Sequence, residues 1–234
     1  MNNVAITSSP EPFIVVEGVS RRYQRKGGPA VTALEGVSLT LPARGMVAIV
    51  GPSGSGKSSL LHLLGAMDHA SEGEVIVAGE RLSGLSEAQL AVFRRKKIGF
   101  VFQSFNLIPT LNALENVMLP MEFNRVSKQE RVKRGKALLE QVGLGQRFTH
   151  RPNELSGGEM QRVAVARAIA NDPPVVLADE PTGNLDSASG EVISALLEQI
   201  AQERLVILVT HSEKLALRAD RVLHIKDGKL LDAA

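Results

Sequence analysis

A glycine-rich segment of the chain carries the residue types that bind phosphate. It reads GPSGSGKSS and follows an apolar run, MVAIV, that is typical of a buried strand. Its glycines let successive backbone amides curl into a concave anion site, which the N-terminus of a following helix would complete. Lys57 would place a positive charge on the β- and γ-phosphates, and Ser58 would offer its hydroxyl to Mg²⁺. The residues of this expected nucleoside-triphosphate site are Gly51, Pro52, Ser53, Gly54, Ser55, Gly56, Lys57, Ser58 and Ser59.

A pair of adjacent carboxylates ends another apolar run. The sequence VVLADEP places Asp179 directly after four apolar residues, and Glu180 follows it. Asp179 is placed to hold the Mg²⁺ shell, and Glu180 could act as the general base that polarises an attacking water. Adjacent carboxylates at a strand end are often only a solvated turn. Beside a phosphate loop, the catalytic interpretation is favoured.

The segment LSGGEM contains two glycines in the first turn of an expected helix. Ser156 and Glu159 have the spacing of a capping box, and apolar residues follow at helical spacing. Gly157 and Gly158 lie between them, although glycine costs about 1 kcal/mol relative to alanine inside a helix. One interpretation is a loop glycine pair before a capped helix. The other is a close approach of a phosphate to the amides of the helix N-terminus.

These candidate residues need strands and helices to position them. Because four short runs are continuously apolar rather than alternating, they predict strands covered on both faces, and so a mostly parallel sheet. Helical patterns lie between them, at 57–67 and 189–201. We therefore expect an α/β fold with the core of a phosphate-loop nucleoside triphosphatase. The four expected strands are 46–50, 98–102, 175–178 and 205–209.

Two further regions are expected to be antiparallel. Residues 13–23 and 31–41 predict an N-terminal β subdomain beside the core. Residues 221–233 predict a hairpin, because Asp227-Gly228 is a strong turn signal between two apolar segments.

The chain is expected to form a single domain over residues 13–234. Residues 1–12 are rich in Ser, Pro and Asn and predict a flexible N-terminal tail. The interval from about 104 to 170 has helical patterns and no clear core strand, so it predicts an inserted α-helical subdomain.

Composition excludes several classes of protein. The chain has 234 residues with a formal net charge of +2, which does not indicate a polyanion-binding surface. It has no cysteine, which rules out disulfides and thiolate metal sites. Apolar runs are too short for a membrane span, and the N-terminus lacks the pattern of a secretory signal. We expect a protein that is made in the cytoplasm and stays there.

The order of the motifs resembles the ATP-binding-cassette (ABC) family. LSGGE, followed closely by VVLADEP, is similar to the signature motif and Walker B segment of that family, and the resemblance extends from about residue 13 to 232. It implies a transport ATPase with ATP and Mg²⁺ as cofactors. The segments around the phosphate loop and ADEPTGNLD most resemble the branch that serves lipoprotein release, macrolide export and related cell-envelope systems.

The resemblance assigns roles to four further residues. Gln103 matches the glutamine loop, which touches the metal and the attacking water, and Asp186 matches the D-loop. His211 matches the switch histidine that contacts the γ-phosphate. Tyr23, the only tyrosine in a chain without tryptophan, matches the aromatic residue that stacks on adenine. Alone, Gln103 could be a polar strand end, Asp186 a helix cap and His211 a surface histidine. The order of these residues along the chain favours the functional interpretation.

The resemblance also implies a second copy of the chain. Two family domains meet head to tail around ATP, so Ser156, Gly157 and Gly158 would approach a γ-phosphate held by the partner. An ATP-dependent homodimer is therefore expected. Glu159 stands where glutamine is commonest in the family, and Ser59 stands where threonine is usual.

The resemblance implies a further partner, an integral membrane permease subunit, which would hold this chain on the cytoplasmic face of the inner membrane. In the family, a groove beside the glutamine loop receives a short helix of that subunit. We expect the groove near Phe105–Met118, where apolar side chains exceed the needs of one amphipathic face. Core packing is the alternative. The apolar residues concerned are Phe93, Phe100, Phe102, Phe105, Leu107, Ile108, Leu111, Leu114 and Met118.

Two other functions are compatible with a phosphate loop. A soluble family member that acts on nucleic acid or ribosomes would usually carry coiled-coil insertions or zinc sites. The only hint of nucleic acid is RRKK at 94–97, which a solvated strand start explains better. A small-molecule phosphotransferase would lack the signature segment. We therefore expect no nucleic-acid partner.

Overall fold

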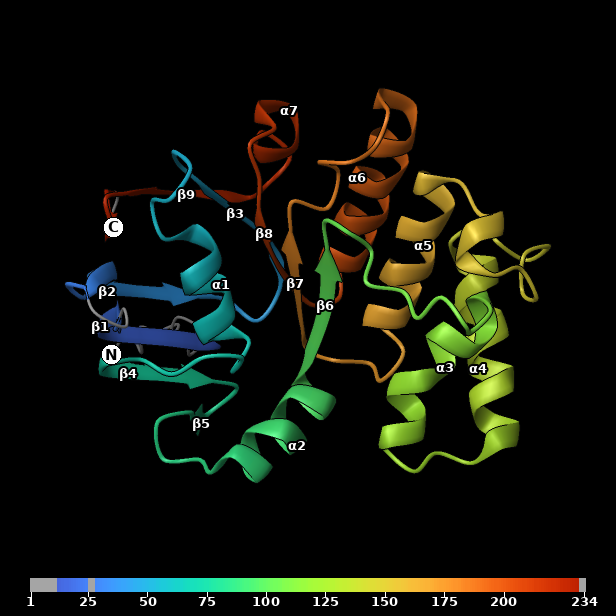
Figure 1. The fold of residues 1–234 in the computed structure, drawn as a ribbon, viewed down its shortest axis with the longest axis horizontal. Coiled ribbons are helices and arrows are strands. Elements are labelled where there is room, and N and C mark those ends of the chain that lie inside the picture. The colour runs from blue at the N-terminus through green and yellow to red at the C-terminus, as the bar shows by residue number, and fades with distance from the viewer. Residues whose placement is uncertain (1–11, 25–27, 232–234) are drawn as a thin grey trace, which may run out of the picture.

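Two β-sheets and the helices around them form the part of the chain that the computed structural model describes, residues 12–24 and 28–231 (Figure 1). The larger sheet has six strands in the order β10-β9-β3-β8-β7-β6. The neighbours from β9 to β6 are all parallel, as the sequence predicts, and β10 alone is antiparallel. The strands are β3 (Gly45–Val50), β6 (Ile98–Phe102), β7 (Val175–Asp179), β8 (Leu205–Val209), β9 (Arg221–Lys226) and β10 (Lys229–Leu230).

The parallel strands are buried on both faces. In β7, Val175 and Leu177 belong to one apolar cluster, whereas Val176 and Ala178 belong to another on the opposite face. The first cluster includes side chains of α1 (Lys57–Leu64) and of the smaller sheet. The second includes side chains of α6 (Ser187–Ala201) and the end of α5 (Gly157–Ala168). Layers on both sides explain why these strands are apolar throughout.

The smaller sheet is antiparallel and has the order β2-β1-β4-β5. Its strands are β1 (Ile14–Tyr23), β2 (Val31–Leu41), β4 (Glu72–Val77) and β5 (Glu80–Arg81). The first two match the predicted N-terminal sheet. The sequence analysis did not include β4 or β5, although β4 pairs with β1 over most of its length.

The C-terminal hairpin is present, as the sequence predicts, although its pairing with the core sheet was not predicted. Asp227 and Gly228 adopt left-handed φ angles of 50° and 76°, as a tight hairpin turn requires. The first strand of this hairpin, β9, is also a parallel neighbour of β3. The region is therefore part of the core sheet and not a separate antiparallel element.

The interval 104–170 is helical, and all of it is described. It contains α3 (Ala113–Phe123), α4 (Lys128–Gln141), a 3₁₀ turn (Pro152–Glu154) and α5. These helices share an apolar cluster of their own, which includes Val117, Leu139 and Val163. We therefore propose the division into a core and a helical subdomain. The expected tail at 1–12 lies outside the described residues, apart from Pro12.

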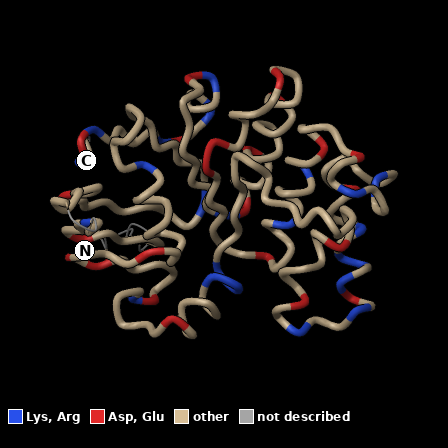
Figure 2. Tube along the Cα trace, in the orientation of Figure 1, with Lys and Arg blue, Asp and Glu red and all other residues tan. Residues whose placement is uncertain are grey.

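The RRKK segment is the last turn of α2 (Glu87–Lys97) and not the start of a strand. Figure 2 shows it as a short basic run near the lower end of the strands. Arg94 donates to the carbonyl oxygen of Ala66, and Arg95 donates to that of Phe123. Basic residues are favourable at a helix C-terminus. Two of the four charges are thus engaged within the chain.

A short helix, α7 (Glu213–Ala216), follows β8.

Candidate functional site

The phosphate loop connects β3 to α1 and is closely packed at two glycines. Gly51 and Gly56 have φ angles of 155° and 105°, and Gly56 is the N-cap of α1. A Cβ atom at Gly51 would clash with the carbonyl oxygen of Ile225, and one at Gly56 would clash with that of Ala33. Only glycine fits these two positions, so the close packing of the loop against the carbonyl oxygens of Ile225 and Ala33 depends on them.

Lys57 folds back over this loop. Its Nζ donates to the carbonyl oxygens of Gly51 and Pro52, at 3.0 and 2.8 Å, and the residue is only 6% exposed. These carbonyls hold the charge at the mouth of the concave loop. Because a lysine ammonium carries three donors, it can exchange these partners for phosphate oxygens.

Ser58 and Asp179 face each other across the site. The Ser58 hydroxyl lies 3.4 Å from Oδ1 of Asp179, which ends β7. Two neighbouring ligands about 2.1 Å from one octahedral Mg²⁺ ion lie about 3.0 Å apart, so a small movement of either side chain would let this pair bind the ion together. Among the described residues, no group of three or more acidic or histidine side chains could hold a metal. A Mg²⁺ ion would therefore need phosphate and water ligands as well.

Glu180 is directed toward His211. Its φ angle of 48° is left-handed, an uncommon conformation for a residue with a side chain. Its Oε2 accepts a bond from the His211 amide at 3.2 Å, and its Oε1 lies 3.3 Å from His211 Nε2. That Oε1 is nevertheless buried and accepts no hydrogen bond, so the imidazole touches it without donating to it. The histidine side chain is 57% exposed.

Gln103 follows β6 and contacts the segment after Glu180. Its Nε2 donates to Oδ1 of Asn184 at 3.4 Å, and Nδ2 of Asn184 donates to the main-chain carbonyl oxygen of Gln103 at 3.1 Å. Phe102, the residue before it, pairs with Asp179 in the sheet. The structure therefore places Gln103 beside the acidic pair. Its side chain is hydrogen-bonded to Asn184, a residue that the sequence patterns did not single out.

The capping box at the start of α5 is confirmed. The Ser156 hydroxyl accepts from the Glu159 amide at 3.2 Å, and Glu159 accepts from the Ser156 amide at 2.9 Å. Arg147 also donates to Glu159 at 2.9 Å. The Ser156 amide first, and then Arg147, lower the pKa of Glu159 from 4.5 to about 2. The first turn of α5 is thus fixed by a carboxylate that stays ionised.

The two glycines of α5 have different surroundings. A Cβ atom at Gly157 would meet Leu185 at 3.5 Å, which is ordinary contact. A Cβ atom at Gly158 would lie 2.5 Å from the Ser189 hydroxyl of α6. Packing within the chain therefore requires glycine at 158 but not at 157.

Asp186 is the N-cap of α6, as the simpler interpretation predicts. Its carboxylate accepts from the Ser189 amide at 2.9 Å and from the Ser189 hydroxyl at 2.8 Å. These bonds, the amide first, lower the pKa of Asp186. Tyr23 ends β1 and is 36% exposed, with its hydroxyl 3.5 Å from the Ser59 hydroxyl of α1.

Arg167 is a residue of this region that the sequence analysis missed. It lies on α5 and donates to the carbonyl oxygens of Phe105 and Asn106, at 2.8 and 2.5 Å. Burial lowers the pKa of its guanidinium. Phe105 and Asn106 are consecutive residues with left-handed φ angles of 61° and 49°. One arginine thus holds a strained segment just after Gln103.

A groove of about 660 Å³ lies between α2, β6, α3 and α5. Only part of the segment expected to form it does so. Asn106 lines the groove, whereas Leu107, Leu114 and Met118 pack against the apolar cluster of the helices. Phe100 and Phe102 stack on each other with their ring centroids 5.4 Å apart, and both line the groove. Other lining residues are Val92, Leu119, Pro120, Phe123 and Arg167.

The structure brings most of the expected residues together at one end of the parallel strands. The phosphate loop, Asp179, Glu180 and His211 follow β3, β7 and β8, where ligands bind in open α/β sheets. The segment Ser156–Gly158 is not part of this group. Figure 1 shows α1 and α5 on opposite sides of β7 and β6.

Comparisons with known proteins agree with this arrangement. A profile of the ABC transporter family matches residues 34–183, which include the phosphate loop, the signature segment and the acidic pair. The chain belongs to the ABC transporter family. It is an ATP-binding cassette of that family, and its relatives are ATP-hydrolysing cassettes.

Three relatives illustrate the range of this family. The lipoprotein-releasing system ATP-binding protein LolD 2 of Rhodopseudomonas palustris is 46% identical over 94% of this cassette and 96% of its own length. The macrolide export ATP-binding/permease protein MacB of Hyphomonas neptunium is 47% identical over 94% of this chain, which spans only 34% of MacB. The solved cassette MJ0796, in a dimeric post-hydrolysis state with ADP and Pi, matches with a TM-score of 0.86 and 42% identity, over 94% of this chain and 97% of that one.

Proposed function

We propose that this ABC cassette binds ATP with Mg²⁺ at its phosphate loop and that Glu180 and His211 carry the hydrolysis. The observation on which the proposal rests is the Oε1 atom of Glu180, which is buried and accepts no hydrogen bond. A buried carboxylate oxygen that accepts no hydrogen bond, and whose contact at 3.3 Å is the His211 imidazole, calls for an explanation, such as a catalytic role. A carboxylate oxygen in this state can accept a proton from an attacking water.

The other residues of the site have complementary tasks. Lys57 would move from two backbone carbonyls to the β- and γ-phosphates, and His211 would donate to the γ-phosphate from its exposed imidazole. Ser58 and Asp179 would hold Mg²⁺, which neutralises phosphate charge when it is bound. Gln103 would contact the metal and the water. Tyr23 would stack on the adenine ring.

We also propose that two copies assemble head to tail around two ATP molecules. Ser156, Gly157 and Gly158 begin α5, which lies on the opposite side of β7 and β6 from α1, so a phosphate at these residues would belong to a partner. Asp186 would lie near the same interface. The dimeric MJ0796 cassettes support this arrangement by similarity.

A separate membrane permease is the partner that we propose for this dimer. MacB and the pyoverdine exporter PvdT of Pseudomonas aeruginosa are named ATP-binding/permease proteins, and this chain spans 34% of each. In the described residues, no helix is long and apolar enough to cross a membrane. The cassette would then sit on the cytoplasmic face of the inner membrane and drive cell-envelope export or lipoprotein release. The 660 Å³ groove would receive a helix of the permease.

Turnover and assembly of purified variants test the proposal. Lys57→Ala should abolish ATP binding, and Glu180→Gln should bind ATP while hydrolysis falls by about 10²–10⁴-fold. Glu203→Gln, with a side chain that is 77% exposed in another part of the chain, is the control. Unchanged turnover in both Lys57→Ala and Glu180→Gln would falsify the assignment.

The Glu180→Gln variant also tests assembly, because it should trap the dimer with ATP. Ser156→Arg would fill the space intended for the partner's γ-phosphate and should prevent this dimer. Light scattering with and without ATP measures both effects. A trapped dimer that tolerates the arginine would contradict the head-to-tail arrangement.

A further inference from the structure

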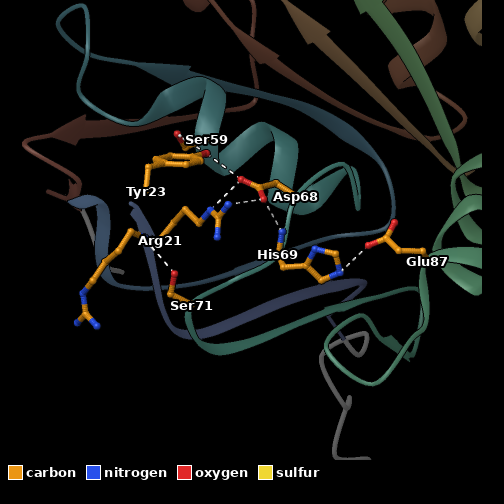
Figure 3. Close-up of polar contacts among 8 residues, drawn as sticks. Arg21, Tyr23, Ser59, Asp68, His69, Ser71 and Glu87 are labelled. Atoms are coloured by element: carbon orange, nitrogen blue, oxygen red, sulfur yellow. Dashed lines mark hydrogen bonds and ion pairs between the residues drawn. The ribbon is translucent and has the colours of Figure 1, made fainter. Parts of the chain in front are cut away.

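We propose that Asp68 and Arg21 are positioning residues that hold the ring of Tyr23 as a fixed platform for the nucleotide base. The inference rests on the proposed ATP site and adds residues that none of the motifs contains. Figure 3 shows the side chains of Arg21 and Asp68 beside the ring, with Ser59 of α1 near its hydroxyl. These residues come from β1 and from the loop after α1.

Asp68 is the centre of this cluster. Its Oδ2 accepts from the Tyr23 hydroxyl and from Arg21 Nε, both at 2.8 Å. Its Oδ1 lies 2.7 Å from Arg21 Nη2 and accepts from the His69 amide at 2.8 Å. The carboxylate is 20% exposed, so these contacts form largely out of water. Bidentate contacts of this kind fix geometry as well as charge.

The charge state of Asp68 fixes the direction of the tyrosine bond. Burial alone would raise the pKa of this carboxyl, but the bonds from Tyr23, the His69 amide and Arg21 outweigh burial and lower it. An ionised carboxylate is only an acceptor, so the phenol must donate to it. That bond prevents free rotation of the hydroxyl and sets the position of the ring edge.

Arg21 occupies one side of the ring. The central carbon of its guanidinium lies 4.4 Å from the ring centroid, within the range of a cation–π contact. Since Arg21 and Tyr23 are two residues apart on β1, their side chains leave the same face of the strand. The guanidinium supports one face of the ring and leaves the opposite face for a base.

The helix α1 joins this platform to the phosphate loop. Lys57, Ser58 and Ser59 lie in its first turn, and Asp68 follows shortly after its last residue, Leu64. The Tyr23 hydroxyl lies 3.5 Å from the Ser59 hydroxyl in this first turn, and the helix is buried on its core side. The distance between phosphates and base is therefore set by one rigid element. A nucleotide that reaches from the phosphate loop to the Tyr23 ring would bind with little loss of side-chain freedom.

The sequence provides a direct probe for the test. Tyr23 is the only tyrosine and the chain has no tryptophan, so the intrinsic emission of the protein reports on this ring alone. We would measure the binding of Mg-ATP to the intact protein and to the variants Asp68→Asn and Arg21→Gln by titration calorimetry, and follow the Tyr23 emission in parallel titrations. Inorganic tripolyphosphate, which has no base, is the second probe. Arg22→Gln is the matched control, because Arg22 is the next residue on β1 but pairs with Glu72.

In the intact protein, ATP should change the Tyr23 emission. Each of the two variants should weaken ATP binding by about three- to tenfold, as loss of one or two such contacts implies, and should raise KM with kcat unchanged. Affinity for tripolyphosphate and the Arg22→Gln control should not change. In a Tyr23→Ala background, Asp68→Asn should have no further effect on ATP affinity, because its only route to the base is gone.

The possible failures are distinguishable. If ATP binds without any change in Tyr23 emission, the base contact in the proposed function is wrong. If that response occurs but both variants bind ATP as the intact protein does, the positioning role is wrong. An equal loss of ATP and tripolyphosphate affinity would instead show that Asp68 acts through α1 and the phosphate loop. If Asp68→Asn does not fold, Arg21→Gln and the same double-variant comparison carry the test.

Discussion

The hydroxyl of Ser189 occupies the space that a side chain at Gly158 would need, 2.5 Å from the position of its Cβ. The same hydroxyl donates to Asp186, the N-cap of α6, so the side chain that packs against the start of α5 is held by the cap of α6. The double glycine of the signature segment thus has two explanations. Gly158 is required by this contact, whereas Gly157 is open to a methyl group and is left for the proposed partner.

The first prediction concerns stability. Gly158→Ala should lower the free energy of unfolding by about 1–3 kcal/mol, because the new methyl group overpacks the contact with Ser189. Gly157→Ala should leave stability unchanged or raise it by up to about 1 kcal/mol through helix propensity. Urea denaturation followed by circular dichroism measures both. Equal destabilisation by the two variants would contradict this account of the pair.

The second prediction concerns assembly, with the same Gly157→Ala substitution. In the Glu180→Gln background it should weaken the ATP-dependent dimer by about tenfold or more, since a methyl group would separate the backbone from the partner's γ-phosphate. Sedimentation at several ATP concentrations measures the effect. The variant keeps its fold, so a dimer of unchanged strength would remove the functional reason for this glycine.

The third prediction concerns acid stability. The pKa of Glu159 falls from 4.5 to about 2 on folding, so its contribution is complete above pH 4.5 and is lost as the pH falls through 2. Glu159→Gln keeps the capping geometry without the charge. The stability advantage of the intact protein over this variant should therefore shrink steadily on acidification below pH 4.5. Denaturant unfolding between neutral pH and pH 3 would reveal it.

Glu159→Ala is the reference for this comparison. It removes the side-chain acceptor of the Ser156 amide and should cost about 1 kcal/mol even where the charge no longer matters. A constant difference between the intact protein and Glu159→Gln at every pH would mean that the carboxylate is not responsible.

The fourth prediction concerns Arg167. Arg167→Lys keeps the charge, but a single ammonium group on a flexible stem does not reproduce the planar fork that contacts Phe105 and Asn106. Amide hydrogen exchange across residues 103–108 should accelerate by about tenfold, which corresponds to about 1.4 kcal/mol. Arg151→Lys, at an exposed position of the same region, should leave this exchange unchanged. Equal exchange in both variants would mean that the guanidinium does not hold the segment.

The fifth prediction concerns the proposed permease. Phe123 lines the groove and is 59% exposed, so Phe123→Asp should preserve the fold and ATP binding but lose association with the membrane fraction. Leu231→Asp is the control, since Leu231 is 60% exposed and follows β10 at the opposite edge of the sheet from β6. Phe123 suits the test better than Leu107, because Leu107 packs partly against the apolar cluster of α3, α4 and α5. Equal association of the two variants would place the docking surface elsewhere.

The sequence predicted those parts of the fold that local patterns encode. Continuous apolar runs identified the strands β3, β6, β7 and β8, because burial on both faces leaves that pattern. The position of β9 was missed because its pairing with β3 joins residues that are far apart in the chain. Helix α2 was not predicted, although the capping box of Ser86 and Gln89 marks its start in the sequence.

The candidate site was predictable where its residues lie in contiguous motifs. The contact between Ser58 and Asp179 and the approach of His211 to Glu180 follow from strand ends that meet at one edge of a sheet. Asp68 carries no such local pattern, because its partners on β1 precede it by more than forty residues. Only the folded chain brings them together.

The order of the larger sheet has a consequence for synthesis of the chain. The two neighbours of β3 are β8 and β9, which lie more than 150 residues later in the sequence. While the protein emerges from the ribosome, the strand that carries the phosphate loop therefore has no sheet partners until β8 and β9 have been made. Pairing over such separations makes folding slow and leaves apolar strands exposed meanwhile. Nascent chains should thus gain the ability to bind nucleotide only after β9 has left the ribosome.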